Sequence, residues 1–354
     1  MKKVLKMIGK ILGIILLVIL VIGIIVYAFV LQYPKLKDDP KIGKWYRVTT
    51  SEMKTSEGDK YRALFKKGSE NKVLIYFAGG GVSCNEDMAR EDTYNTKEVA
   101  IDMLANLTMN MGGIASDVEE SPFEDWSIIL FPYATGDFHA GTGEFHYTDT
   151  DGKEKILNYT ETMKKVMEQA GINDADTVLV TGYSAGGFGA ALLADDVFTN
   201  YFPDAKSKNV LVDASLLLNN DWHSIATDVW QTPKEISNKL VSNNLTLDCF
   251  ASLHKKYGDD IHLLFDCSTR DGDLAKVQNY FDDGIMDVDE KQADEFQQIL
   301  KEAIPEFKEA GVSLFIWDGV PWYDDPRNMT AHTIIATPAV WIPFEEQKNL
   351  LQNG

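Results

Sequence analysis

Residues 177–189 read Thr-Val-Leu-Val-Thr-Gly-Tyr-Ser-Ala-Gly-Gly-Phe-Gly, an apolar run that leads directly into a serine between glycines. The run from Thr177 to Thr181 predicts a buried strand, and the pattern from Phe188 to Phe198 predicts a helix. Gly-x-Ser-x-Gly at such a junction is typical of the sharp turn that exposes the nucleophile of serine hydrolases. The turn needs small neighbours on both sides of Ser184. The stretch therefore predicts an α/β fold with Ser184 at the end of a central strand.

The strand in this stretch is one of six apolar runs of strand length along the chain. They are continuous rather than alternating, which indicates strands buried on both faces of a mostly parallel sheet flanked by helices, as in the α/β-hydrolase-like class. The runs are Val73–Phe77, Ile128–Phe131, Val178–Val180, Val210–Val212, His262–Phe265 and Val312–Ile316. The remaining predicted helices are Glu98–Asn110, Tyr159–Ala170, Pro233–Leu240 and Glu290–Ala310. Two antiparallel hairpins are also expected, one from Trp45–Thr50 and Tyr61–Phe65 and one closed at Asp151-Gly152.

The N-terminal segment differs from the rest of the chain. The run from Ile11 to Leu31 is apolar and carries no charge, and about 20 such residues span a bilayer as a helix. The charged residues before it are Lys2, Lys3, Lys6 and Lys10. This positive bias predicts a cytoplasmic N-terminus with the remainder outside the cell. We expect a single-pass anchor at 1–31 in contact with the lipid bilayer, a stalk at 32–44 and one α/β-hydrolase-like domain at 45–354. A cleaved signal peptide is the alternative, although its apolar core is usually shorter.

The composition is that of a globular protein and argues against nucleic acid as a partner. The 354 residues are 45% hydrophobic and 25% charged, which is ordinary for a globular chain with a sizeable core. The formal net charge is -20, and the region after the four N-terminal lysines holds all 54 acidic residues. Nucleic acid is therefore not an expected partner, because it would meet like charge. Three cysteines allow at most one internal disulfide, and their pairing stays open between one bridge and none.

A hydrolase of this fold needs a histidine and an acid after the nucleophile in chain order. Of the six histidines, His332 alone follows the last predicted strand. The acid is expected in the loop after His262–Phe265, where Asp271 is the first choice and Asp273 the alternative. Asp266 is disfavoured because it falls within the strand. The acid would hold the tautomer of the imidazole and stabilise the imidazolium.

A second loop could supply the backbone donors that an acyl-transfer site needs for its oxyanion. Ala78-Gly-Gly-Gly-Val82 follows a predicted strand, and its glycines allow close approach of the backbone to a substrate. We assign the N–H groups of Gly81 and Val82, together with that of Ala185 after the nucleophile, as the donors to the oxyanion. A phosphate-binding loop is the alternative, but no Gly-Lys-Ser/Thr follows.

With these motifs in order, the region from about Val73 to Trp341 resembles the pectin acetylesterase family. The glycine run followed by Cys84 and Asn85, the stretches 121–126 and 131–141, the elbow at 182–189, the acid loop at 267–271 and His332 carry the resemblance. It implies a carboxylesterase that removes short acyl groups, typically acetate, from a polysaccharide, or in one branch a fatty acyl group from a secreted protein.

The residues by themselves predict ester hydrolysis through an acyl-enzyme, with Ser184 attacking, His332 moving the proton and Asp271 orienting the imidazole. We expect the pocket to be bordered by Tyr133, Asp137, His139 and Trp322, with a supporting structural role as the alternative for the first three. No metal or organic cofactor is expected. A non-catalytic binding protein and a serine peptidase on the same fold are the alternative functions.

Overall fold

An eight-stranded sheet forms the centre of the structure, a computed structural model that describes residues 33–91, 93–94, 112–116, 121–159, 161–320 and 323–341. Its strand order is β1-β2-β4-β3-β7-β8-β9-β10. The strands are β1 (Trp45–Val48), β2 (Ala63–Lys66), β3 (Lys72–Phe77), β4 (Ser127–Phe131), β7 (Thr177–Tyr183), β8 (Ser207–Asp213), β9 (Ile261–Ser268) and β10 (Val312–Trp317). Each predicted strand is therefore confirmed, with small differences at its ends.

Six of these strands pair in parallel and the first two add an antiparallel edge. Strands β4, β3, β7, β8, β9 and β10 are parallel neighbours, whereas β1 pairs with β2 and β2 with β4 in the antiparallel sense. The second hairpin, β5 (Glu144–Thr148) with β6 (Glu154–Asn158), forms a separate small sheet. The carboxyl ends of the parallel strands thus meet at one edge, where this class of fold places its ligands.

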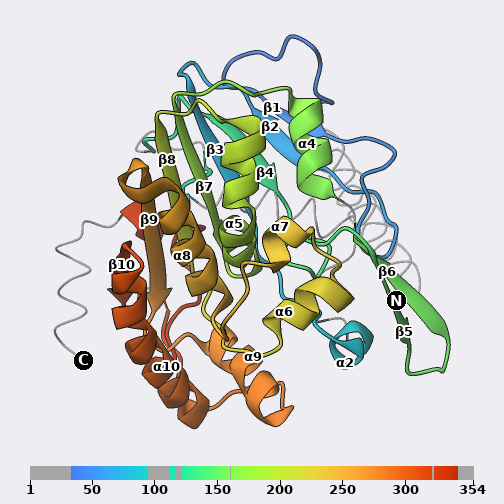
Figure 1. Ribbon diagram of the computed structural model, residues 1–354, viewed down its shortest axis with the longest axis vertical. Helices are drawn as coiled ribbons and strands as arrows, with labels where there is room; N and C mark the ends of the chain where they lie inside the picture. The colour runs from blue at the N-terminus through green and yellow to red at the C-terminus, as the bar shows by residue number, and fades with distance from the viewer. Residues whose placement is uncertain are drawn as a thin grey trace, which may run out of the picture.

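Helices cover the sheet and complete the α/β class (Figure 1). They are α2 (Glu86–Arg90), α4 (Thr162–Ala170), α5 (Ala185–Asp196), α6 (Trp222–Ser224), α7 (Lys234–Ser237), α8 (Leu245–Tyr257), α9 (Gly272–Asp283) and α10 (Glu290–Glu309). The helices predicted at 159–170, 188–198 and 290–310 are confirmed, and the one predicted at 233–240 is reduced to α7. The longer helices α8 and α9 and the short helices α2 and α6 were not predicted. The helix predicted at Glu98–Asn110 lies outside the described residues.

The two faces of the sheet contact different segments of the chain. Along β3, Val73, Ile75 and Phe77 point into the larger core beneath the helices, whereas Leu74 and Tyr76 point into a second core. Ile334 and Ile335 from the C-terminal segment pack in that second core. Alternate side chains of one strand are therefore buried on opposite faces, which explains the continuous apolar runs.

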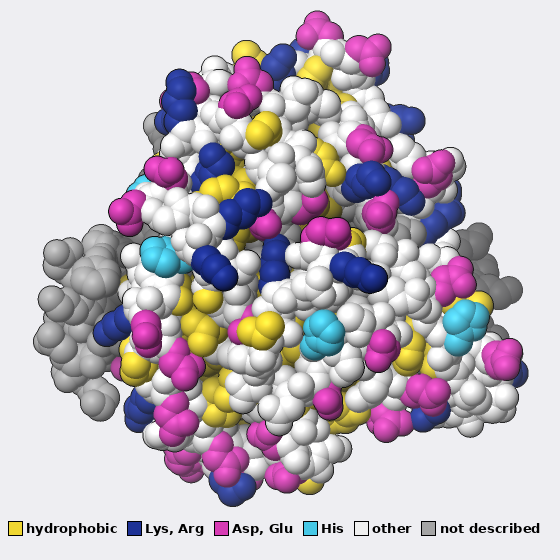
Figure 2. Space-filling view, in the orientation of Figure 1, with side chains coloured by type: hydrophobic (Ala, Val, Ile, Leu, Met, Phe, Trp, Pro, Cys, Tyr) yellow, Lys and Arg dark blue, Asp and Glu magenta, His cyan; other side chains and the backbone are white. Residues whose placement is uncertain are grey.

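The surface of the helical layer is acidic in places. Figure 2 shows Asp and Glu side chains gathered over α9 and α10. On α10, Glu295, Glu302 and Glu306 are exposed, while Phe296 and Phe307 are buried. The helix is thus amphipathic, and its charged face lies toward solvent.

Two expectations about the chain concern cysteines and the membrane. Cys84, Cys249 and Cys267 are all free and buried, so no disulfide links them. Among the described residues no helix combines the length and apolarity needed to cross a membrane. The anchor predicted from Ile11 to Leu31 lies outside those residues.

Glycine at the junction of β7 and α5 allows the helix to start directly over the sheet. A Cβ atom on Gly186 would lie 2.0 Å from the carbonyl oxygen of Phe77, and one on Gly182 would lie 2.5 Å from the same oxygen. Real Cβ atoms do not approach a backbone oxygen so closely. The glycines of the elbow are therefore required by packing against β3.

Replacing Gly186 by alanine should destabilise the fold because the methyl group forces β3 and α5 apart. We expect the free energy of unfolding to fall by roughly 1–3 kcal/mol or more, measured by urea denaturation. Gly319→Ala is the matched control, since a Cβ there has no atom within 4 Å. Equal unfolding midpoints for the two variants would contradict the packing argument.

Candidate active site

The backbone at Ser184 is held in an unusual conformation. Its φ is +53° and its ψ is -128°, in a region that residues other than glycine rarely adopt. The Ser184 N–H donates to the carbonyl oxygen of Asp213 at 2.8 Å, and its own carbonyl oxygen accepts from Gly187 N–H at 2.9 Å and from Ser215 Oγ at 2.7 Å. These bonds hold the turn that the sequence predicted, and the side chain of Ser184 borders a cavity.

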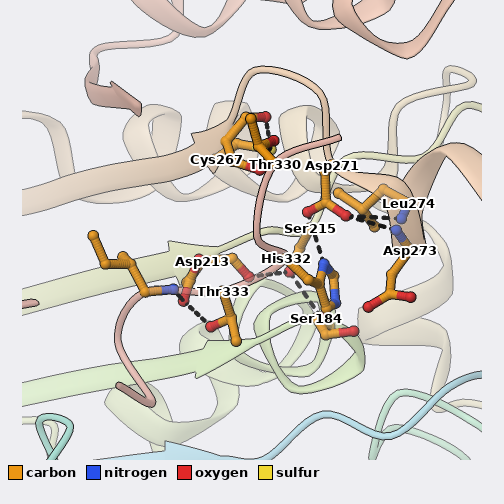
Figure 3. Close-up of polar contacts among 12 residues, drawn as sticks. Ser184, Asp213, Ser215, Cys267, Asp271, Asp273, Leu274, Thr330, His332 and Thr333 are labelled. Atoms are coloured by element: carbon orange, nitrogen blue, oxygen red, sulfur yellow. Dashed lines mark hydrogen bonds and ion pairs between the residues drawn. The ribbon is translucent and has the colours of Figure 1, made fainter. Parts of the chain in front are cut away.

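The histidine and the acid that were predicted from chain order meet in the structure. His332 Nδ1 lies 2.7 Å from Asp271 Oδ2. The other carboxylate oxygen of Asp271 accepts from the N–H groups of Asp273 and Leu274, each at 3.0 Å, and so caps α9. Figure 3 shows the imidazole between Asp271 and Ser184. Of the two acids left open by the sequence, Asp271 is the one that contacts His332.

Burial and charge set the titration of this pair. Burial raises the pKa of Asp271, against the opposing effect of His332. Burial by itself would lower the pKa of His332, but the charge and the hydrogen bond of Asp271 outweigh it and raise that pKa to about 9. The imidazolium is thus favoured in the free protein, and His332 becomes a base only as the pH rises toward that value.

A cavity of about 620 Å³ brings together the residues expected at the site. Ser184, Ala185, His332, Gly81 and Val82 all line it. An apolar wall lines the same cavity, formed by Met88, Phe138, Phe188, Leu217, Leu274, Val277 and Met286. Its charged lining residues are Glu91, Asp273 and Lys276. The chemistry-bearing residues and a hydrophobic surface therefore share one opening.

The glycine loop passes close to the nucleophile. A Cβ atom on Gly79 would lie 2.7 Å from Ser184 Cβ, so only glycine allows this approach. Gly81 has a φ of +92° and forms a bridge with Tyr94, while Thr93 Oγ1 donates to the carbonyl oxygen of Val82 at 2.6 Å. Ala185 is the first residue of α5, and its N–H has no acceptor within the helix. The expected donor groups thus lie around the same cavity as Ser184.

Three residues expected to border the pocket lie behind the glycine loop instead. Tyr133, Asp137 and His139 are buried, and none lines the cavity at Ser184. A Cβ on Gly80 would lie 2.9 Å from the Tyr133 ring. Burial lowers the pKa of His139 to about 4, so the neutral ring donates from Nε2 to the carbonyl oxygen of Ala78 at 3.0 Å. These contacts match the alternative supporting role. Trp322 lies outside the described residues.

The apolar wall was not predicted from the sequence. Phe138 lies between Asp137 and His139, two residues expected at the pocket, and it is Phe138 that lines the cavity. Met88, Leu217 and Met286 come from separate segments with no shared pattern. In the part of the chain that the structure describes, no group of three or more His, Cys, Asp or Glu side chains could hold a metal ion.

Fold and sequence comparisons place the chain in a class and in a family. The mostly parallel sheet with flanking helices is an α/β-hydrolase-type fold. A family model described as pectinacetylesterase matches residues 60–259. The chain belongs to the pectinacetylesterase family, which supports an esterase activity. The matched stretch contains the glycine run and Ser184 and ends before Asp271 and His332.

Solved structures support the same fold. One crystal form of the Wnt deacylase Notum from Drosophila has a TM-score of 0.57 and 16% identity, covering 85% of this chain and 87% of that one. A second crystal form has a TM-score of 0.56 and 15% identity, covering 82% and 86%. A comparison with curated proteins finds no match.

The contact between His332 and Asp271 predicts the pH dependence of hydrolysis. A base must be neutral to accept a proton, so kcat/KM should rise as the pH increases through the pKa of His332, about 9. Asp271→Asn removes the charge that favours the imidazolium. We expect kcat/KM to fall by on the order of 10³–10⁴ and the rising limb to move to lower pH, measured with p-nitrophenyl acetate.

Asp273→Asn is the matched control for this variant. It removes a carboxylate from the cavity without breaking the bond to His332, so its shift should be in the same direction and smaller. A rising limb that stays in place in Asp271→Asn would exclude Asp271 as the partner that sets the titration.

Proposed function

We propose that the protein is a serine carboxylesterase that removes acyl groups from an ester substrate. The observation that carries the proposal is the contact of His332 Nδ1 with Asp271 Oδ2 at 2.7 Å, made by a histidine that lines one cavity with Ser184. Membership of the pectinacetylesterase family supports the same reaction class.

In the proposed mechanism, Ser184 Oγ attacks the carbonyl carbon of the ester while His332 Nε2 takes the hydroxyl proton. Asp271 accepts from Nδ1–H and stabilises the imidazolium that forms. The N–H groups of Gly81, Val82 and Ala185 donate to the oxyanion of the tetrahedral intermediate. His332 then gives its proton to the leaving alcohol. A water molecule then attacks the acyl-enzyme while His332 takes its proton. The acid leaves, and His332 returns the proton to Ser184 Oγ.

The proposed substrate is an acylated polysaccharide or another acylated molecule outside the cell, with acetate as the first candidate acyl group. The name of the family supports acetate. The apolar wall of the cavity, which includes Phe138, Phe188 and Met286, also suits a longer chain. The neighbour named a Wnt deacylase is a precedent for deacylation on this fold.

The proposed location is the cell membrane, with residues 1–31 as a single-pass anchor and the esterase domain outside the cell. The apolar run and the four lysines before it support this arrangement. The full chain should resist extraction from membranes by alkaline carbonate. Release of the full chain by carbonate would contradict the anchor.

A series of p-nitrophenyl esters from acetyl to palmitoyl tests the reaction and the acyl length together. We expect hydrolysis of the esters. Ser184→Ala should lower kcat/KM to the background rate, because it removes the hydroxyl that attacks the ester in the proposed mechanism. The matching p-nitroanilides separate an esterase from a peptidase. Faster cleavage of anilides than of esters, or full activity in Ser184→Ala, would reject the proposal.

A further inference from the structure

The loop that carries His332 is tied to the sheet through one buried carboxylate. Asp213 is the last residue of β8 and has no exposed surface. Its Oδ2 accepts from the N–H groups of Ile334 and Ile335, both at 2.9 Å, and from the hydroxyl of Thr333. These three donors come from the three residues directly after His332, as Figure 3 shows for Thr333.

The same residue also holds the nucleophile. The backbone carbonyl oxygen of Asp213 accepts from Ser184 N–H at 2.8 Å. On the other side of His332, Thr330 N–H donates to the carbonyl oxygen of Arg270 at 3.0 Å, next to Asp271. The chain is therefore held by hydrogen bonds on both sides of His332. The bond before it lies beside Asp271, and the bonds after it go to Asp213, which also bonds to Ser184.

A second buried carboxyl group lies beside Asp213. Asp266 occupies the neighbouring register position on β9 and is 2% exposed. The charge of Asp213 raises the pKa of Asp266, and Trp317 Nε1 donates to Asp266 Oδ1 at 3.3 Å. Two carboxyl groups can share a hydrogen bond only if one carries a proton.

The contacts indicate which of the two holds that proton. Asp213 Oδ2 already accepts three donors, which stabilises its ionised form. Asp213 Oδ1 is buried and has no hydrogen-bond partner among the described residues. Burial raises the pKa of both carboxyl groups, and the charge of Asp213 raises that of Asp266 further. The favoured site for a proton on this pair is therefore Asp266.

We propose that Asp213 is a positioning residue of the active site, whose carboxylate clamps residues 333–335 and so holds His332 between Asp271 and Ser184. In this proposal a protonated Asp266, at the paired register position on β9, supplies the donor for Asp213 Oδ1, a buried oxygen with no partner among the described residues. The inference rests on the proposed function only in taking His332 as the base.

Two isosteric variants of the full chain test the clamp. In Asp266→Asn the amide N–H replaces the O–H donor and leaves Asp213 ionised, so kcat should stay within about threefold of the parent. In Asp213→Asn the charge that binds three donors is lost. We expect kcat to fall by roughly 10- to 100-fold with KM nearly unchanged, because His332 is misplaced.

A readout independent of turnover separates positioning from simple stabilisation. The proton between His332 Nδ1 and Asp271 gives a low-field ¹H NMR signal, assigned by its loss in Asp271→Asn. We expect Asp213→Asn to shift or abolish this signal and Asp266→Asn to retain it. Thr333→Val removes one donor to Asp213 without changing a residue of β8 or β9. It should lower kcat less than Asp213→Asn does.

The outcomes are distinct. The clamp is wrong if Asp213→Asn lowers only the unfolding temperature and leaves both kcat and the low-field signal unchanged. It is also wrong if Asp266→Asn lowers kcat as much as Asp213→Asn does. If Asp213→Asn does not fold, an unchanged kcat in Thr333→Val overturns the proposal instead. Full activity in Ser184→Ala would reject the esterase mechanism, whereas the NMR comparison would still test the clamp.

Discussion

The close approach of α5 to β3 is the constraint on which the rest of the site depends. The helix begins so near the sheet that a Cβ on Gly186 would meet the Phe77 carbonyl oxygen at 2.0 Å. The chain reverses within one residue, and Ser184 takes up the strain with a φ of +53°. The hydroxyl that results lies at the carboxyl edge of the parallel strands, beside the glycine loop that leaves β3. A looser junction would move Ser184 away from that loop. The close packing of α5 on β3 therefore also places the hydroxyl of Ser184.

Burial then determines how the charged groups behave. Asp271 is removed from water and can stay ionised only because His332 and the first turn of α9 donate to it. The same reasoning applies one strand away, where Asp213 accepts three donors and its charge raises the pKa of the buried Asp266. Each buried carboxylate therefore organises a loop, and the two loops meet at His332. In this proposal a carboxylate on each side holds the loop of His332 in place.

Much of this arrangement could be predicted from the sequence, and the parts that could not have physical reasons. Strands buried on both faces leave continuous apolar runs, so the sheet was predictable, and chain order identified His332. Asp271 and Asp273 lie only two residues apart in the sequence, and only the folded geometry decides which carboxylate faces the imidazole. The helix α8 buries Leu245, Phe250 and Leu253, a spacing that indicated a helix but was overlooked. The cavity wall joins Met88, Leu217 and Met286 from distant segments, which leaves no local pattern.

The central claim is that Ser184 forms the acyl-enzyme, and locating the acyl group tests it most directly. The protein would be mixed rapidly with p-nitrophenyl acetate, quenched in acid, digested and mapped by peptide mass spectrometry. We expect a burst of p-nitrophenol and an acetyl group on Ser184, because in the proposed mechanism His332 activates only that hydroxyl. An acetyl group on another residue that turns over at the catalytic rate, or a burst with Ser184 unmodified, would contradict the account.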